Sequence, residues 1–449
     1  MKEFNFEKLP IVEIANEIII DAVNKGASDI HFDPSKEALK IRFRIDGILS
    51  DYSIVPSKYK RNMISRIKMI AGMNIMETRL PQDGAIKSKI GDRLLDLRVS
   101  TLPTNNAEKI VIRILDYSMS LAGLDNLGFS KDAMEKINKL IRIPNGIILV
   151  TGATGTGKST TLYSILQKLN TEEVNIITVE DPVEMDIAGI NQVQTQTEIG
   201  LTFATILRSI LRQDPNIIMI GEIRDDETAR IAVRASITGH LVLSTLHTNN
   251  SLNTIERLTD MDVERYLLGS SLEGIISQRL ARKLCPNCMI KRQTTEYEKQ
   301  VFKTVIGKDI NEMYVANKEG CPRCNHGYRG RLAILEVLIM NEKIKDAITN
   351  NAPKHVLRDL VYTGEVVTLL QDGLNKVVEG ETSFEEILKI VDLENDMTAY
   401  KDDNLVANLK MAQKAHSIKE TPQQPTPQAT QQVQQINNQI PNNVETVEF

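Results

Sequence analysis

The 449-residue chain carries 54 Lys and Arg against 59 Asp and Glu, which gives a formal net charge of −5, and 41% of its residues are hydrophobic. This length predicts two to three domains, and the acidic balance argues against a nucleic-acid coat as the main activity. No apolar run reaches the length of about 18 residues that a membrane span needs, and the N-terminus lacks the apolar core of a signal peptide. The four cysteines form two pairs of equal spacing, which favours metal binding over disulfides, so we expect a cytoplasmic protein.

The N-terminal region predicts a small α+β unit over residues 1–117. Its apolar residues first repeat at helical spacing over 11–25 and stop at Gly26. Extended segments and a basic helix-like stretch follow, at 27–34, 39–49, 58–71, 87–102 and 108–115. The basic stretch fits either a solvated helix face or a contact surface for another subunit. Two glycines in 118–128 predict a hinge to the next unit.

A nucleotide-phosphate loop follows an apolar run at 147–150. Its glycines let successive N–H groups face phosphates at a helix N-terminus, and apolar residues at helical spacing follow the loop as required. Lys158 is predicted to reach the β- and γ-phosphates, and the Ser159 hydroxyl to complete the shell of a Mg²⁺ ion. The candidate ATP-binding residues are Gly152, Thr154, Gly155, Thr156, Gly157, Lys158, Ser159 and Thr160.

From about 129 to 280, short apolar runs alternate with amphipathic helical patterns, which predicts a mainly parallel sheet with helices on both faces. Two of the strands end in acids, at Glu180 and Glu222. Acids at these tips can hold Mg²⁺ and orient the attacking water, although strand-end salt bridges are the alternative. Gly221 stands where the commoner nucleotidase arrangement has an Asp, so we expect Glu180 to share the metal or water duty with Glu222.

Two histidines, His240 and His247, flank one predicted strand. They are either ordinary polar residues at its ends or a sensor that hydrogen-bonds the γ-phosphate and couples hydrolysis to movement.

Two Cys-x-x-Cys pairs predict a structural Zn²⁺ site formed by Cys285, Cys288, Cys321 and Cys324. Free cysteines or a disulfide pair are the alternatives. The segment between the pairs is long enough to form its own small lobe, at about 283–330, which the metal would hold folded. Helical patterns return over 331–392. The Gln/Pro/Asn-rich composition of residues 393–449 cannot form a core and predicts disorder.

Taken together, these segments resemble the type II secretion and type IV pilus assembly ATPases. The resemblance covers roughly residues 11–392 in the family's order and is carried by the strings GASDIHFDP, RFRIDG, RLPQDGAI, LRVSTLPT, VTGATGTGKSTTLY, VEDPVE, LRSILRQDPNIIMIGEIRD, TGHLVLSTLHTN and GCPRCNHGYRGRLAILEVL. It implies an α/β chain with a PAS-like N-terminal domain over 1–117, a hinge over 118–128, and a RecA-like P-loop ATPase domain over 129–392 with the tetracysteine insert.

The resemblance also assigns roles to residues of this chain. Lys158 and Ser159 match the phosphate-loop lysine and Mg²⁺ hydroxyl, and Glu180 and Glu222 fall in the two acidic boxes. The two histidines fall in the histidine box. The family uses N-terminal arginines to touch the phosphates, often across subunits. The candidates are Arg79, Arg98 and Arg113, for which structural salt bridges are the alternative.

The implied function is a hexameric ATPase motor at the cytoplasmic face of the cell membrane. It would turn a polytopic inner-membrane platform protein and so add subunits to a type IV pilus or a type II secretion pseudopilus. The cysteine insert favours the assembly branch of the family. A DNA-uptake pseudopilus motor, a ring scaffold without hydrolysis and a nucleic-acid translocase are the alternatives, the last disfavoured by few aromatics for base stacking. Assembly members usually carry a further N-terminal docking domain, which we do not expect here, and the Gln/Pro-rich tail has no counterpart in the family.

Overall fold

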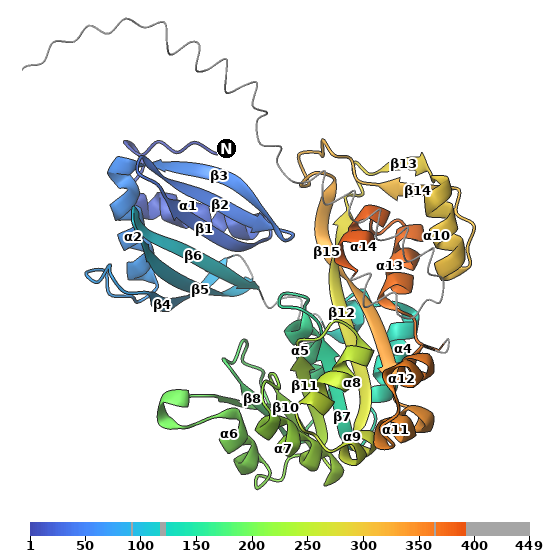
Figure 1. Ribbon diagram of the computed structural model, residues 1–449. Helices are drawn as coiled ribbons and strands as arrows, with labels where there is room; N and C mark the ends of the chain where they lie inside the picture. Colours follow the sequence, from blue (N-terminus) through green and yellow to red (C-terminus); the bar gives the residue numbers. More distant parts are fainter. Residues whose placement is uncertain (91–92, 117–122, 363–364, 392–449) are drawn as a thin grey trace, which may run out of the picture. The chain divides into compact units, whose positions relative to one another are not determined.

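The computed structural model describes residues 1–90, 93–116, 123–362 and 365–391 (Figure 1). The predicted disordered tail, residues 393–449, lies outside the described residues, as do the first residues of the predicted hinge. No helix within the described ranges has both the length and the apolar character that crossing a membrane requires.

The N-terminal domain is a six-stranded antiparallel sheet packed against two helices. Its strands lie in the order β3 (Ile48–Pro56), β2 (Ala38–Ile45), β1 (Ala27–Pro34), β6 (Ala107–Asp116), β5 (Arg93–Thr104) and β4 (Gln82–Ile90). Helices α1 (Ile11–Asn24) and α2 (Ser57–Ile70) pack their apolar sides on the sheet, where Phe32, Phe43 and Ile67 are almost fully buried. Alternating burial along β1 and β2 explains why these segments form strands with one covered face.

The second domain is built on a seven-stranded, mainly parallel sheet. Its strands lie in the order β15 (Tyr328–Ile339), β12 (Leu272–Leu284), β7 (Gly146–Thr151), β11 (Leu241–Leu246), β10 (Ile217–Ile220), β8 (Ile176–Glu180) and β9 (Asn191–Gln194). The inner strands are buried along their whole length, as expected for a sheet covered on both faces. Only β15 runs antiparallel to its neighbour β12 among these described strands.

Helices cover both faces of this sheet. One core contains residues of α6 (Phe203–Ile210), α7 (Asp226–Ile237), α8 (Ser251–Asp260), α9 (Arg265–Ser271), α11 (Glu342–Thr349) and α12 (Lys354–Val361). The other contains residues of η1 (Leu124–Asn126), α4 (Lys131–Leu140) and α5 (Lys158–Leu169). A short helical turn, η2 (Thr197–Ile199), precedes α6. The predicted α/β fold class, an N-terminal sheet domain followed by a parallel-sheet domain, is confirmed.

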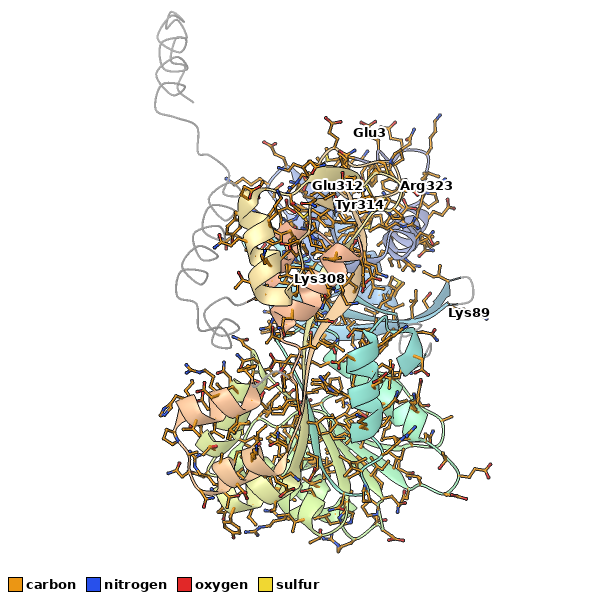
Figure 2. All side chains as sticks on the ribbon, turned by 90° about the vertical axis from the view of Figure 1, so that its right-hand side faces the viewer. Glu3, Lys89, Lys308, Glu312, Tyr314 and Arg323 are labelled. Carbon is orange, nitrogen blue, oxygen red and sulfur yellow. The ribbon has the colours of Figure 1, made fainter. Side chains whose placement is uncertain are left out.

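A small lobe joins the ends of the two longest strands of the second domain. In Figure 1, β12 and β15 extend from the main sheet toward the two-stranded sheet of β13 (Ile290–Gln293) and β14 (Glu312–Val315). Helices α10 (Glu296–Ile306), α13 (Leu369–Val378) and α14 (Phe384–Ile390) pack beside it. Glu312, labelled in Figure 2, pairs with Lys291 of β13 at 2.5 Å.

Candidate nucleotide site and metal centre

The phosphate loop curls between the end of β7 and the start of α5, as the sequence predicts. Gly152, Gly155 and Gly157 have φ angles of 150°, 80° and 88°, in the region that side chains rarely adopt. Gly157 is the N-cap of α5, so the first-turn N–H groups of Lys158, Ser159 and Thr160 have no acceptor within the helix. Such a loop at a helix N-terminus suits an anion such as a phosphate chain.

Lys158 points its ammonium group back into the loop. Its Nζ donates to the carbonyl oxygens of Gly152 at 2.9 Å and Ala153 at 3.1 Å, and the residue is 8% exposed. Burial lowers the Lys158 pKa, and the negative charge of Glu222 partly opposes that shift. A cation held inside the loop is placed to interact with the phosphates that the loop would hold.

The carboxyl ends of four parallel strands meet at the edge where the loop lies. Thr151 of β7 pairs with Leu246 of β11, Ser244 of β11 with Ile220 of β10, and Ile220 lies beside Val179 of β8. Residues at the carboxyl ends of these strands are far apart in the sequence but lie close together at this edge of the sheet. Ligands of open α/β sheets bind at this edge.

Three of the predicted residues form one cluster there. His247 Nε2 lies 3.6 Å from Glu222 Oε2, and both residues interact electrostatically with Lys158. Arg224 donates to Glu222 at 2.5 Å, and this bond is the largest of the effects that lower the Glu222 pKa. Glu222 is therefore a carboxylate at neutral pH, and an acceptor that can orient a water molecule.

His247 is held neutral. Burial and then the nearby Lys158 ammonium lower its pKa below the ordinary value of 6.5, whereas Glu222 acts in the opposite direction. A neutral imidazole can donate one hydrogen bond and accept another. That property suits a contact with a phosphate oxygen.

The opposite effects of the two neighbours predict opposite titration shifts in variants. Glu222→Gln removes a negative charge, so the His247 pKa should fall further; Lys158→Ala removes a positive charge, so it should rise. Both shifts can be measured by NMR titration of labelled histidines, with the His247 signal assigned by its loss in His247→Gln. Lys168→Ala, at the far end of the same helix, serves as the control with no shift. Shifts of the same sign in both variants would contradict the cluster.

The loop that carries His247 is anchored from the neighbouring strand and helix. Arg279 of β12 donates its Nη2 to the carbonyl of Asn249 at 2.9 Å and is 8% exposed. The Asn250 side chain caps α8 by accepting from the N–H of Asn253 at 2.9 Å. The segment after His247 is thus held at two adjacent residues, Asn249 and Asn250.

Glu180 lies in a different environment from Glu222. It is 3% exposed, and its Oε1 accepts from Thr178 Oγ1 at 2.6 Å and Gln192 Nε2 at 3.0 Å. The Tyr163 hydroxyl donates to its other oxygen. Since Tyr163 belongs to α5 and Thr178 to β8, this carboxylate ties the helix after the phosphate loop to the sheet. No contact with Lys158 or His247 is found for Glu180 among the described residues.

The structure places the two histidines at opposite ends of β11. His240 precedes β11 and His247 follows it. The carbonyl of His240 accepts from Gly146, the first residue of β7, and its Nδ1 lies 2.8 Å from the Ala235 carbonyl. Five residue steps along the strand, roughly 17 Å, separate this end from the phosphate-loop end. His240 therefore fits the alternative of a polar residue at a strand end.

The three candidate arginines all pair with acids of the N-terminal domain. Arg79 is 85% exposed and bonds Glu77 at 2.7 Å, and this pairing lowers the Glu77 pKa to about 2. Arg98 lies 3.3 Å from an oxygen of Asp96. Arg113 lies 3.2 Å from one of Asp29 and is 64% exposed. These pairs match the salt-bridge alternative, and a contact with phosphates stays a prediction.

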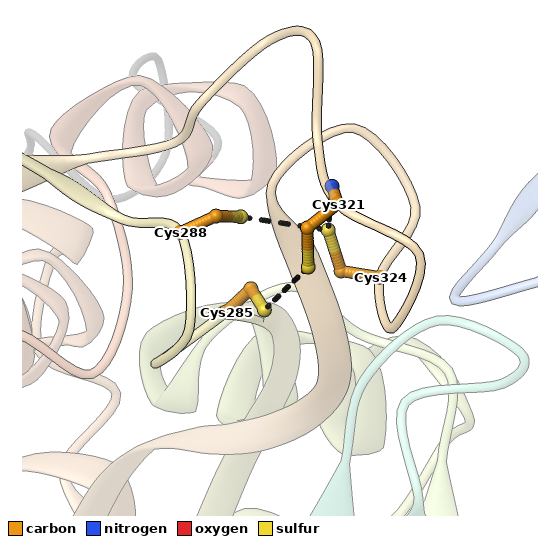
Figure 3. Close-up of side chains that lie close together, drawn as sticks. All are labelled: Cys285, Cys288, Cys321 and Cys324. Carbon is orange, nitrogen blue, oxygen red and sulfur yellow. Dashed lines mark hydrogen bonds between the residues drawn. The ribbon is translucent and has the colours of Figure 1, made fainter.

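The four cysteines converge on one point (Figure 3). Their sulfur atoms lie within 4.8 Å of one another, with Cys285 and Cys321 at 3.8 Å and Cys288 and Cys324 at 3.6 Å. Zn–S bonds of about 2.3 Å in a tetrahedron separate the sulfurs by about 3.8 Å, so the arrangement fits a Zn²⁺ ion. Four thiolates leave no open coordination position, as in structural zinc sites.

The backbone around the cysteines explains this convergence. Cys285 directly follows β12, and its N–H donates to the Gly327 carbonyl at 2.8 Å. Gly327 has a φ of 83°, and a Cβ there would lie 2.6 Å from backbone atoms of Asn317, so only glycine fits. The Cys321 N–H also donates to Cys324 Sγ at 3.2 Å. The pairing of Leu284 with Tyr328 then closes the lobe at its base.

Sequence reasoning missed two residues that shape the nucleotide site. Gln278 of β12 is 2% exposed and bonds both the phosphate loop and α5. Tyr163 is buried beside Glu180. The polar trio at 277–279, between apolar residues on a strand with buried positions, was an available signal for Gln278, because polar residues in a covered strand need buried partners.

The family model described as "Type II/IV secretion system protein" matches residues 5–389 of this chain. The chain belongs to this family. It is 44% identical over 382 residues to the "Type II secretion system ATPase E" of Vibrio cholerae, covering 85% of this chain and 75% of that one. It is 45% identical over 381 residues to the "Type IV pilus assembly ATPase PilB" of Myxococcus xanthus, covering 84% of this chain and 67% of that one.

Two solved structures are similar in fold to most of this chain. The pilus retraction motor PilT, solved with bound ADP, is 26% identical with a TM-score of 0.54, covering 88% of this chain and 98% of that one. The ATPase DotB of Legionella pneumophila is 21% identical with a TM-score of 0.63, covering 86% and 97%, and shows the fold alone. The resemblance inferred from the motifs is confirmed.

Proposed function

We propose that this chain is a Mg²⁺-dependent ATPase that forms a hexameric ring and drives assembly of a type IV pilus or a type II secretion pseudopilus. The observation that carries the proposal is the cluster of Lys158, Glu222 and His247 at the phosphate loop of a chain so similar to a secretion ATPase and a pilus assembly ATPase. The tetracysteine site accords with the assembly branch predicted from the sequence.

The residues of the cluster divide the work of hydrolysis. The loop N–H groups and Lys158 hold the β- and γ-phosphates. The Ser159 hydroxyl would be a ligand of Mg²⁺, and that ion would neutralise phosphate charge. Glu222, a carboxylate beside Arg224, orients the attacking water and accepts its proton. Neutral His247 hydrogen-bonds a γ-phosphate oxygen. Its contact with Glu222 places the phosphate-binding histidine beside the residue that orients the attacking water.

Glu180 serves as a buried anchor in this proposal. Its two oxygens already accept from Tyr163, Thr178 and Gln192, so it holds α5, and with it the phosphate loop, against β8. Zn²⁺ bound by the four cysteines would stabilise the small lobe without taking part in the reaction.

The two glutamates can be told apart by amide substitution. Glu222→Gln should lower kcat by about 10³-fold while ATP still binds, because the base is lost and the shape is kept. Glu180→Gln should instead destabilise the fold by about 2 kcal/mol, since an amide NH₂ cannot accept the hydrogen bonds that the carboxylate accepts. Turnover assays and thermal unfolding measure the two effects. A Glu180→Gln protein of normal stability with no turnover would reverse the assignment.

The motor itself is tested by assembly state and by filament formation. With a non-hydrolysable ATP analogue, mass photometry should show a species of six times the 50.4 kDa chain mass. Cells whose only copy carries Glu222→Gln should lack the filament, and the protein should be recovered with cytoplasmic membranes only when the platform protein is present. A monomer under all nucleotide conditions would contradict the ring.

A further inference from the structure

Gln278 occupies the strand position directly beside the phosphate loop. Ser277 of β12 pairs with Thr151, the last residue of β7, so Gln278 lies level with Gly152, where the loop begins. The residue is 2% exposed although it is polar. A buried amide of this kind needs partners, and both of its partners belong to the loop and its helix.

The amide of Gln278 makes two short hydrogen bonds. Its Nε2 donates to the carbonyl of Thr156 at 2.8 Å, and its Oε1 accepts from the hydroxyl of Thr161 at 2.8 Å. The Thr156 carbonyl can only accept, so the nitrogen of the amide must face it. One side chain thus links the end of the phosphate loop with the first turns of α5.

Two loop glycines let the backbone approach this strand closely. A Cβ at Gly152 would lie 2.5 Å from the carbonyl oxygen of Gln278, and a Cβ at Gly157 would lie 2.8 Å from its Nε2. The loop is therefore in contact with Gln278 at both ends. The intervening Ala153–Gly155 segment is exposed and does not contact Gln278 through these glycine positions.

We propose that Gln278 is a positioning residue that holds the phosphate loop in its nucleotide-binding curvature from the neighbouring strand. Gln278 does not touch the nucleotide. It fixes Thr156 and Thr161, and through them the loop N–H groups and the Lys158 ammonium that would contact the phosphates. This role rests on the proposed ATP binding. It explains why a glutamine, with one donor and one acceptor group, stands between Ile276 and Leu280 on the same face of the strand.

The test compares three variants in the full-length protein by the dissociation constant of fluorescent ADP. Gln278→Leu, which keeps the volume and loses both hydrogen bonds, should weaken ADP binding about tenfold. Gln278→Glu changes one atom, yet it should weaken binding more, because a carboxylate oxygen then faces the Thr156 carbonyl. Thr161→Val should weaken binding by itself and add nothing in the Gln278→Leu background. The KM for ATP should rise by a larger factor than kcat falls.

Gln371→Leu is the matched control. The Gln371 amide also makes two hydrogen bonds, in its case to the backbone N–H of Thr368 and the backbone carbonyl of Val305, but at the N-terminus of α13. It should affect stability and leave the affinity for ADP unchanged. If it weakens ADP binding as much as Gln278→Leu, the effect is one of general stability and the proposal fails.

The remaining outcomes separate this proposal from the proposed function. A wild-type protein that binds neither ADP nor ATP overturns the function itself. A wild-type protein that binds ADP, together with Gln278→Leu and Gln278→Glu proteins that bind within twofold of it, overturns the positioning role alone. If Gln278→Leu fails to fold by circular dichroism, the Thr161→Val protein decides, and unchanged ADP affinity there overturns the role.

Discussion

Replacing Lys158 with alanine is expected to reduce kcat for ATP hydrolysis by about 10³-fold, the range found when a preorganised charge that stabilises a transition state is removed. Lys158 is 8% exposed, and its ammonium group lies within 3.1 Å of two loop carbonyls, so water cannot readily replace it. Phosphoryl transfer builds charge on the γ-phosphate oxygens, and this cation would neutralise part of it.

Two further lysine variants make the Lys158 experiment specific. Lys168→Ala removes an equal charge from the same helix, where the side chain is 35% exposed and lies 3.2 Å from Asp125, and should keep wild-type turnover. Lys158→Arg keeps the charge but replaces a compact, buried ammonium with a larger planar group, so it should also be inactive. Steady-state turnover with thermal unfolding as the fold check measures all three. An ATP turnover of Lys158→Ala equal to that of the wild-type protein would contradict the proposed ATPase function.

Replacing Cys285 with serine is expected to abolish zinc binding and unfold the small lobe. A structural Zn²⁺ contributes an apparent 10–16 kcal/mol or so in small zinc domains, which is comparable with the whole stability of a folded domain. Cys285 is fully buried at the end of β12, so its loss removes a ligand at the base of the lobe. The metal content should fall from about one Zn²⁺ per chain to none.

The Cys285 experiment has two readouts and a neighbouring control. Elemental analysis counts the metal, and limited trypsin digestion reports unfolding, because the segment between the cysteine pairs holds Lys291, Arg292, Lys303 and Lys318 as cleavage sites. Asn287→Ser, an exposed change between two of the ligands, should keep both metal and protease resistance. Wild-type protein that is prepared without chelators and contains no metal would refute the zinc site.

Much of the local structure was predictable because its causes are close together in the sequence. The phosphate loop needs glycines in backbone conformations that other residues avoid, next to a lysine and a hydroxyl at a helix start, and all of these lie between Gly152 and Ser159. Each Cys-x-x-Cys pair likewise supplies two metal ligands that are close together in the sequence. The folded chain then brings the two pairs together. The family followed from these motifs in their order, and the comparisons confirm it.

The distinction between Glu180 and Glu222 was not available from the sequence, because both are acids at the carboxyl ends of buried strands. The packing of Tyr163, Thr178 and Gln192 around one of them decides which carboxylate is buried and which faces Lys158. The two histidines illustrate the same limit. They are seven residues apart, yet an extended strand carries them to opposite edges of the sheet.

The sequence by itself determined that this protein has a phosphate loop, a four-cysteine site and a place in the secretion ATPase family, since each depends on residue types at short fixed spacings. Tertiary structure alone decided which strand supports the phosphate loop. Gln278 lies more than a hundred residues from Thr156 in the chain, and the two meet only because β12 is placed beside β7. Strand order brings such partners together, and no local pattern encodes it.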